Sequence, residues 1–343
     1  MNNLIITNKD DAQGKKSVSL KNIIRGIKLD KIRRIAWSIV RLILVLGISY
    51  IILYPTIIQF SMSFMERADM YDASVKYIPK HYTLQNIKVV YNSMDYLRVV
   101  LNTFVLCGAV TFLQMVSCTL VGYGLARFNF KFKGLIFAAV ILTIIVPPQA
   151  FIISQYLHFR YFDVLNIVKM INGEGLNLLN SFWPFMLLAC TCLGLRNGIH
   201  VFIMRQYFRG MPKELEESAL VDGANTFKTF YKIMLPHAIP PLITVLLFSF
   251  VWQWNDAYFS YIYLPQLRVM SSALFQLPYY LTYNMQVEDF KQMADMAQTP
   301  INPMDRIRWT ATGSLMSIAP LLVMYAFCQR YFVESVERAG IVG

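Results

Sequence analysis

The chain alternates long apolar stretches with shorter polar segments. A helix needs roughly 20 mostly apolar residues to cross a hydrocarbon core about 30 Å thick. Stretches of this kind occur at 36–60, 99–125, 135–156, 180–204, 236–263 and 313–331. They lack the alternation of polar and apolar positions that the strands of a transmembrane barrel would show. The pattern therefore predicts an all-α polytopic membrane protein with about six transmembrane helices.

The composition supports a membrane location and a simple division of the chain. Hydrophobic residues make up 56% of the sequence and charged residues 15%, which is too apolar for an ordinary soluble domain. Residues 1–35 form a basic tail, and 36–343 are expected to form one transmembrane domain. The first apolar stretch lacks a small-residue cleavage pattern, so we expect a retained helix and not a removed signal peptide.

The distribution of basic residues predicts the orientation. If the N-terminus is inside, the segments with excess Lys and Arg all lie on the cytoplasmic side: 1–35, 126–134, 205–235 and 332–343. The outer segments 61–97, 157–179 and 264–312 balance acids and bases almost evenly. Both termini are therefore expected in the cytoplasm. The net charge of +12 reflects this asymmetry and attraction to anionic lipid, so nucleic acid is not an expected partner.

The sequence offers no pattern typical of catalysis or metal binding. The cysteines all fall in apolar stretches, where thiols usually pack as small hydrophobes: Cys107, Cys118, Cys190, Cys192 and Cys328. The histidines are widely spaced, and no G-x-x-x-x-G-K-[ST] phosphate loop is present. We expect no disulfide, metal site, bound cofactor or catalytic residue in this chain.

The polar segment at 205–235 is patterned like a pair of short helices. Pro212 suits the first position of a helix, and the acidic residues that follow favour the positive end of its dipole. Asp222 and Gly223 then form a turn signal, after which a second amphipathic helix leads to Pro236. Periodicity alone fits equally well with two helices lying on the lipid headgroups.

Specific residues in this segment favour a docking loop over a pair of helices that lie on the headgroups. The segment resembles the EAA loop of type I ABC importer permeases, whose pattern is E-A-A-x-x-x-G followed by I-x-L-P. The matching residues are Glu217, Ser218, Ala219, Gly223, Ile233, Leu235 and Pro236. Only Ser218, in place of Ala, departs from the pattern. The resemblance implies a MetI-like permease fold in which 205–235, here called the coupling loop, docks into a cleft of a separate ATPase.

The resemblance also implies roles for individual residues. Glu217 would make a polar contact with the ATPase, and Ala219, Asp222 and Gly223 would shape a close-packing turn. Leu215 and Leu220 would anchor the loop through apolar contacts. The implied partners are a second, MalF-like permease, two ATPase subunits that use ATP and Mg²⁺, and an extracytoplasmic binding protein.

Further motifs resemble the carbohydrate branch of these permeases, the group that includes the maltose importer's MalG subunit. They are VGYGLARFNFKFKG, the VPP at 146–148, SFVWQWNDAY at 249–258 and QRYFVESVERAGIVG at 329–343. The implied function is import of a sugar or oligosaccharide by alternating access. Another small polar solute is an alternative. An ion-driven secondary transporter would predict internal repeats and several intramembrane acids, whereas the sequence offers one, Asp256.

Polar groups within the apolar stretches are candidates for the substrate pathway, because lipid penalises them. They are Arg196, Trp252, Trp254, Asn255, Asp256 and Tyr258. Aromatic faces beside hydrogen-bonding groups suit sugar rings. The alternatives are an interfacial aromatic belt, a partly solvated helix end at Asp256, and a contact of Arg196 with the second permease. Pro147 and Pro148 should kink the third stretch, and 264–312 is expected to be an extended outer loop.

Overall fold

The computed structural model describes residues 20–164, 166–283 and 303–341, and these are mostly helical. The chain divides into two units, 1–58 and 59–343. Helix α1 (Leu20–Phe64) begins within the predicted basic tail and continues from the first unit into the start of the second. Its large apolar side chains are exposed from Ile32 to Ile57. The all-α fold class predicted from the sequence is confirmed.

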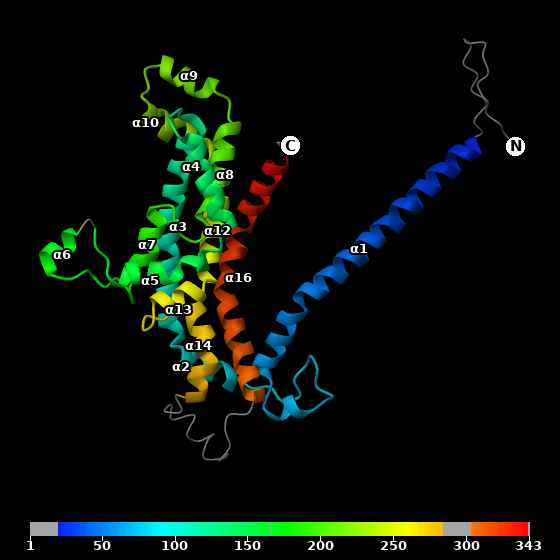
Figure 1. The fold of residues 1–343 in the computed structure, drawn as a ribbon. Coiled ribbons are helices and arrows are strands. Elements are labelled where there is room, and N and C mark those ends of the chain that lie inside the picture. Colours follow the sequence, from blue (N-terminus) through cyan, green and yellow to red (C-terminus); the bar gives the residue numbers. More distant parts are fainter. Residues whose placement is uncertain (1–19, 165, 284–302, 342–343) are drawn as a thin grey trace, which may run out of the picture. The chain divides into compact units, whose positions relative to one another are not determined.

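The second unit contains all the remaining helices that the structure describes (Figure 1). In chain order they are η1 (Ala68–Tyr71), α2 (Gln85–Met94), α3 (Tyr96–Arg127), α4 (Lys133–Ile145), η2 (Pro148–Phe151), α5 (Ile152–Arg160), α6 (Ile167–Asn172), α7 (Trp183–Cys190), α8 (Asn197–Gly210), α9 (Glu214–Val221), α10 (Thr226–Thr229), η3 (Phe230–Met234), α11 (Leu235–His237), α12 (Ile239–Trp254), α13 (Tyr258–Tyr263), α14 (Met270–Tyr283) and α16 (Pro303–Ile341). The turn η3 is a π-helix.

The spanning helices are more broken than the apolar pattern predicts. Within the described residues, Lys31–Phe64, Tyr96–Arg127 and Met304–Gln329 are each long and apolar enough to cross a membrane, and two bent helix pairs bring the number to as many as five. The expected span 180–204 is divided into α7 and α8. Cys192 and Arg196 adopt left-handed backbone conformations in the break between them. Such conformations interrupt a right-handed helix, which hydropathy cannot reveal.

The predicted kink at the proline pair is confirmed. Helix α4 ends at Ile145, and Pro147 has an extended backbone before η2 begins. The two arms of this pair are bent by 99°. Proline lacks a backbone N–H and clashes with the preceding turn, which accounts for the break. The second bent pair, Thr226–His237 with Ile239–Trp254, changes direction by 75°.

The segment expected to be an extended outer loop is partly helical. Helix α14 lies within 264–312, and α16 begins at Pro303. Leu277 of α14 packs in a buried cluster with Trp254 and Trp309. The apolar spacing of α14 is interrupted by Pro278, which obscures the helix in the sequence. Residues 284–302 lie outside the described part of the chain.

Helix α3 lies at the centre of the packing in the second unit. Its side chains contribute to buried clusters shared with α7, α8 and α12. The contact with α8 is close, because a Cβ built on Gly122 would lie 2.6 Å from Cβ of Met204. Only glycine permits the two helices to approach this closely.

This contact predicts that Gly122→Val destabilises the bundle. The added side chain should force α3 and α8 apart, and such overpacking typically costs about 1–3 kcal/mol. Gly108→Val on the same helix is the control, because nothing lies within 4 Å of a Cβ placed there. Thermal unfolding of the detergent-solubilised protein should show a lower midpoint for Gly122→Val alone. Equal midpoints for the two variants would contradict the prediction.

The segment between α1 and α2 carries a pH-sensitive pair. Nδ1 of His81 lies 2.8 Å from Oδ1 of Asp69, and the His81 amide donates to Oδ2 at 2.8 Å. Burial raises the pKa of Asp69, but the hydrogen bonds from His81 outweigh it and the pKa lies below its ordinary value. Hydrogen bonding and charge attraction by Asp69 raise the pKa of His81.

The pair predicts a loop that loosens as the solution becomes basic. Because the pKa of His81 is raised in the folded state, the stabilisation is complete below its ordinary value of 6.5 and is lost as the pH rises through the raised value. Hydrogen exchange of residues 66–82, corrected for intrinsic rates, should therefore speed up above that value. In Asp69→Asn this pH dependence should disappear; a persistent dependence would exclude the pair as its source.

Candidate functional site

The predicted coupling loop forms a helix, a turn and a second helical segment at one end of the second unit, opposite the end that carries α2 and the start of α16 (Figure 1). Helix α9 carries Glu214, Glu216 and Glu217 in its first turn, where carboxylates stabilise the positive end of the helix dipole. Pro212 precedes α9 by two residues and does not occupy its first turn, which corrects the expected start of this helix.

The turn between α9 and α10 has a defined backbone. Gly223 has φ +77°, a left-handed conformation that glycine adopts without strain. The Gly223 amide donates to the Leu220 carbonyl at 3.0 Å, and the Ala224 amide donates to the Ala219 carbonyl at 2.9 Å. The side chain of Asn225 then caps α10 by accepting from the Lys228 amide at 2.8 Å. These bonds end one helix and begin the next within a few residues.

Glu216 ties the loop to the transmembrane helix α3. Its carboxylate accepts a hydrogen bond from the Tyr123 hydroxyl at 3.0 Å and lies 3.6 Å from Nε of Arg127. Arg127 also donates to the Met211 carbonyl at 2.8 Å. We call Tyr123, Arg127 and Glu216 the α3 brace. Glu216 is not a residue of the sequence motif; it lies one residue before Glu217 and therefore on a different face of α9.

The residues of the predicted motif divide between the interior and the surface. Ala219 is buried within the chain, whereas Glu217 and Gly223 are exposed. Leu215, Ile233 and Leu235 are half-buried, and Asp222 and Pro236 are exposed. The buried side chains of the π-helical turn, Phe230 and Met234, pack against Tyr123, Met204 and Phe208. The close packing around Ala219 is therefore contact within this chain.

Large apolar side chains remain exposed where α9 ends and the second segment begins. Val221 is 88% exposed and Phe227 is 74% exposed, and Leu220 and Tyr231 are also exposed. We call these four residues the apolar tip. Leu220 was predicted as an anchor from the sequence. Val221 was missed, because its place next to the turn signal gave no indication that it would be the most exposed of the four.

Two predicted pathway residues meet at a cavity of about 740 Å³, which both Arg196 and Asp256 line. Trp252, Trp254, Asn255 and Tyr258 do not line it. The Arg196 guanidinium lies 4.6 Å from the centre of the Trp252 ring.

The two tryptophans are engaged by other protein groups. Trp252 stacks on His200 with ring centres 5.3 Å apart. Trp254 is 1% exposed, and its Nε1–H donates to the Ser317 carbonyl at 3.3 Å. This burial is unlike the position of a residue in an interfacial aromatic belt.

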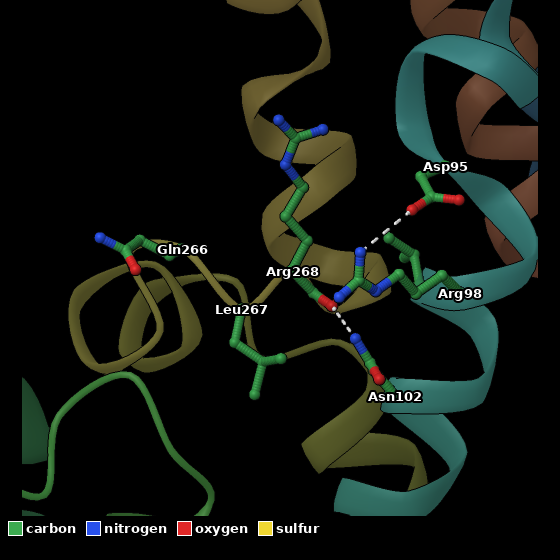
Figure 2. Close-up of a pocket in the computed structure, with 7 residues that line it drawn as sticks. Asp95, Arg98, Asn102, Gln266, Leu267 and Arg268 are labelled. Atoms are coloured by element: carbon green, nitrogen blue, oxygen red, sulfur yellow. Dashed lines mark hydrogen bonds and ion pairs between the residues drawn. The ribbon is translucent and has the colours of Figure 1, made fainter.

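A smaller pocket of about 310 Å³ lies between the start of α3 and the segment before α14 (Figure 2). Asn102 donates to the Arg268 carbonyl at 3.1 Å, and Arg98 lies 3.9 Å from Asp95. The side chains of Arg98 and Asp95 are largely exposed, so the ion pair contributes little. Among the described residues, no group of three or more His, Cys, Asp or Glu side chains is arranged to hold a metal ion.

Comparison with known proteins identifies the family. The sequence model of the family described as binding-protein-dependent transport system inner membrane component matches residues 119–337, which include the coupling loop and most of the residues that line the large cavity. The chain belongs to this family. It is a permease subunit of an ABC importer, and its relatives are permease subunits and not ATPases.

Curated relatives share about a quarter of their residues with the chain over most of its length. A probable ABC transporter permease of Pyrococcus horikoshii is 27% identical over 71% of this chain and 72% of the relative. The arabinooligosaccharide permease AraQ of Bacillus subtilis is 25% identical over 77% and 81%. A solved bacterial importer of the acidic polysaccharide alginate matches with a TM-score of 0.64 at 19% identity, over 87% of this chain and 96% of that one. That likeness supports the fold.

The α3 brace predicts a measurable effect on the loop. Glu216→Ala leaves the buried guanidinium of Arg127 without its carboxylate, which should destabilise the loop by about 1–3 kcal/mol. Hydrogen exchange of residues 211–224 should accelerate accordingly. Glu217→Ala is the control, because it removes a carboxylate from the same first turn without touching Arg127, and it should speed exchange much less. Similar exchange in both variants would show that the brace does not hold the loop.

Proposed function

We propose that this chain is a permease subunit through which a sugar or oligosaccharide enters the cell. We also propose that a separate ATPase binds the coupling loop and thereby changes the conformation of the permease. The observation that carries this proposal is the apolar tip, held outside the bundle by a braced helix and turn. A group of exposed apolar side chains, unlike a single one, is typical of a surface that binds a partner. The exposed Glu217 supplies a polar contact beside them.

The coupling loop and both termini lie in the cytoplasm under this proposal. The excess of basic residues in 126–134 and 205–235 supports that orientation. Two ATPase subunits bind and hydrolyse ATP with Mg²⁺, and one of them receives Leu220, Val221 and Phe227 in a surface cleft. A second, MalF-like permease completes the pathway, and an extracytoplasmic binding protein delivers the substrate.

The brace gives the proposal a mechanism. Movement of the ATPase pulls on α9, and the contacts of Glu216 with Tyr123 and Arg127 pass that movement to α3. Because α3 packs on α7, α8 and α12, the displacement reaches the helices around the large cavity. Coupling of this kind is reciprocal, so ATP binding favours the same state of the bundle that favours tight docking of the loop.

The relatives favour a sugar as the transported substrate, and they suggest one other solute as an alternative. Curated relatives include permeases for arabinooligosaccharides, for α-glucosides and for sn-glycerol-3-phosphate. Uptake into proteoliposomes by the complete transporter tests the proposal, with arabinotriose, maltose and sn-glycerol-3-phosphate offered in turn. Uptake that requires the ATPase and ATP is expected for one of the two sugars. Uptake by this chain alone on an ion gradient would overturn the proposal.

The turn at Gly223 predicts how the coupling fails. Gly223→Leu places a branched side chain in a left-handed conformation, at a cost of about 1–2 kcal/mol, and should reorient the apolar tip. Uptake should fall by about tenfold or more while the protein still inserts and assembles. Gly223→Asn is the matched control, because asparagine tolerates this conformation and nothing lies within 4 Å of the added Cβ.

A second substitution separates charge from backbone geometry. Glu217→Lys keeps the helix but reverses the exposed charge, and should also uncouple ATP hydrolysis from uptake. Normal transport by both Gly223→Leu and Glu217→Lys would contradict docking at this loop.

A further inference from the structure

Three cationic side chains lie together where α4 begins and α8 ends, at the end of the second unit that carries the coupling loop (Figure 1). They are Lys133, the first residue of α4, and Arg205 and Arg209 in the last two turns of α8. The charges of Arg205 and Arg209 are close enough to repel that of Lys133, and Arg209 also repels Arg205. We call these three residues the basic cluster.

The positive charge of the basic cluster is not balanced within the described part of the chain. None of the three residues forms an ion pair with an Asp or Glu side chain there. Arg205 makes one long hydrogen bond, of 3.5 Å, to Oε1 of Gln206, and its buried Nε has no partner among the described residues. Because like charges held together repel, the cluster is suited to an anionic ligand.

Two of the cations are held in place by contacts with α3 and α4. Nζ of Lys133 donates to the Phe128 carbonyl at 2.8 Å and to the Ala126 carbonyl at 3.4 Å, where α3 ends. The Arg205 guanidinium lies 3.7 Å from the centre of the Phe137 ring, one turn into α4. These contacts already restrict two long side chains, so less conformational entropy is lost when a ligand binds.

The surface beside the basic cluster is apolar along the length of α4. Helix α4 contains no buried residue, and Leu135, Ile136, Leu142 and Ile145 are exposed. A helix of 13 residues is about 20 Å long, which exceeds the roughly 15 Å of hydrocarbon in one leaflet. An acyl chain can therefore lie along α4 while its headgroup reaches the cations.

The segment before α4 supports a position at the lipid headgroups. The candidate span that contains α4 begins at Lys133. Phe128, Phe130 and Phe132 precede it and are all exposed. Exposed aromatic and basic side chains together are typical of surfaces that lie at the boundary between headgroups and acyl chains.

We propose that the basic cluster binds the phosphate group of one anionic phospholipid, whose acyl chains lie along α4. An acidic side chain of a partner protein would neutralise the cations but would leave the apolar surface of α4 uncovered, whereas a phospholipid matches both. The inference goes beyond the proposed function and does not depend on which solute is carried. Because α8 leads into the coupling loop, the lipid holds the two helix ends together beneath that loop.

Native mass spectrometry of the complete transporter tests the site. The transporter, purified in an uncharged detergent, is mixed with phosphatidylglycerol or with phosphatidylcholine, which carries no net charge. Arg205→Gln and Lys133→Gln should each retain one phosphatidylglycerol fewer per complex than the unmodified transporter, and the same amount of phosphatidylcholine. Unchanged retention of phosphatidylglycerol in both variants would overturn the inference.

Arg98→Gln is the matched control. It removes one positive charge from a largely exposed side chain at the start of α3, at the far end of that helix from the cluster. It should retain as much phosphatidylglycerol as the unmodified transporter, and an equal loss would show an effect of net charge alone. If Arg205→Gln does not assemble because its contact with Phe137 is lost, Arg209→Gln replaces it, since the Arg209 side chain is exposed.

Two further results distinguish a lipid from other anions. Inorganic phosphate at the same concentration as the lipid should not displace phosphatidylglycerol, because the ion lacks the contacts of the acyl chains. Displacement would show that the cluster recognises free phosphate, and would overturn the lipid assignment. Loss of an ATPase subunit or of the second permease from these variants, with phosphatidylglycerol retained, would assign the cluster to a protein contact. None of these measurements requires a transported solute, so their failure leaves the proposed function standing.

Discussion

The contact of Glu216 with Tyr123 and Arg127 is the interaction on which the rest of the structure depends. It joins a small polar loop to the helix around which the second unit packs, and Gly122, next to Tyr123, lies directly against Met204 of α8. A flexible attachment would absorb any displacement of the loop. The combination of a charged brace and a glycine contact one residue away makes the attachment stiff.

The large cavity lies beside the breaks in the transmembrane helices. Irregular backbone is tolerated at membrane depth only where it is buried in protein or lines a cavity. The interruptions at Pro147 and Pro148, at Cys192 and at Arg196 all border this space. The breaks in the helices therefore leave space for the cavity, and the continuous helix α3 packs against the helices around it.

The sequence predicted the helical class, the proline kink and the two short helices of the loop, because each follows from hydropathy or from a local turn signal. It did not predict the division of 180–204, since the left-handed residues Cys192 and Arg196 are neither glycine nor proline. The site was predicted in part. Motif spacing selected Glu217 and Gly223, which are exposed on the loop, and the penalty for polar groups in lipid selected Arg196 and Asp256, which line the large cavity; their roles stay predictions. Glu216 was missed, because its importance depends on the neighbours that it meets in three dimensions.

The π-helical turn at Phe230–Met234 has a consequence for partner choice. A π-helical turn holds one residue more than an α-helical turn contains. The extra residue sets the rotation of Phe227 relative to the α12 helix that follows. A permease with an ordinary α-helical winding here would present its aromatic side chain about 100° away around the axis. Under the proposed docking, the winding of the main chain, as well as the side chains at the surface, would determine which ATPase subunit fits the loop.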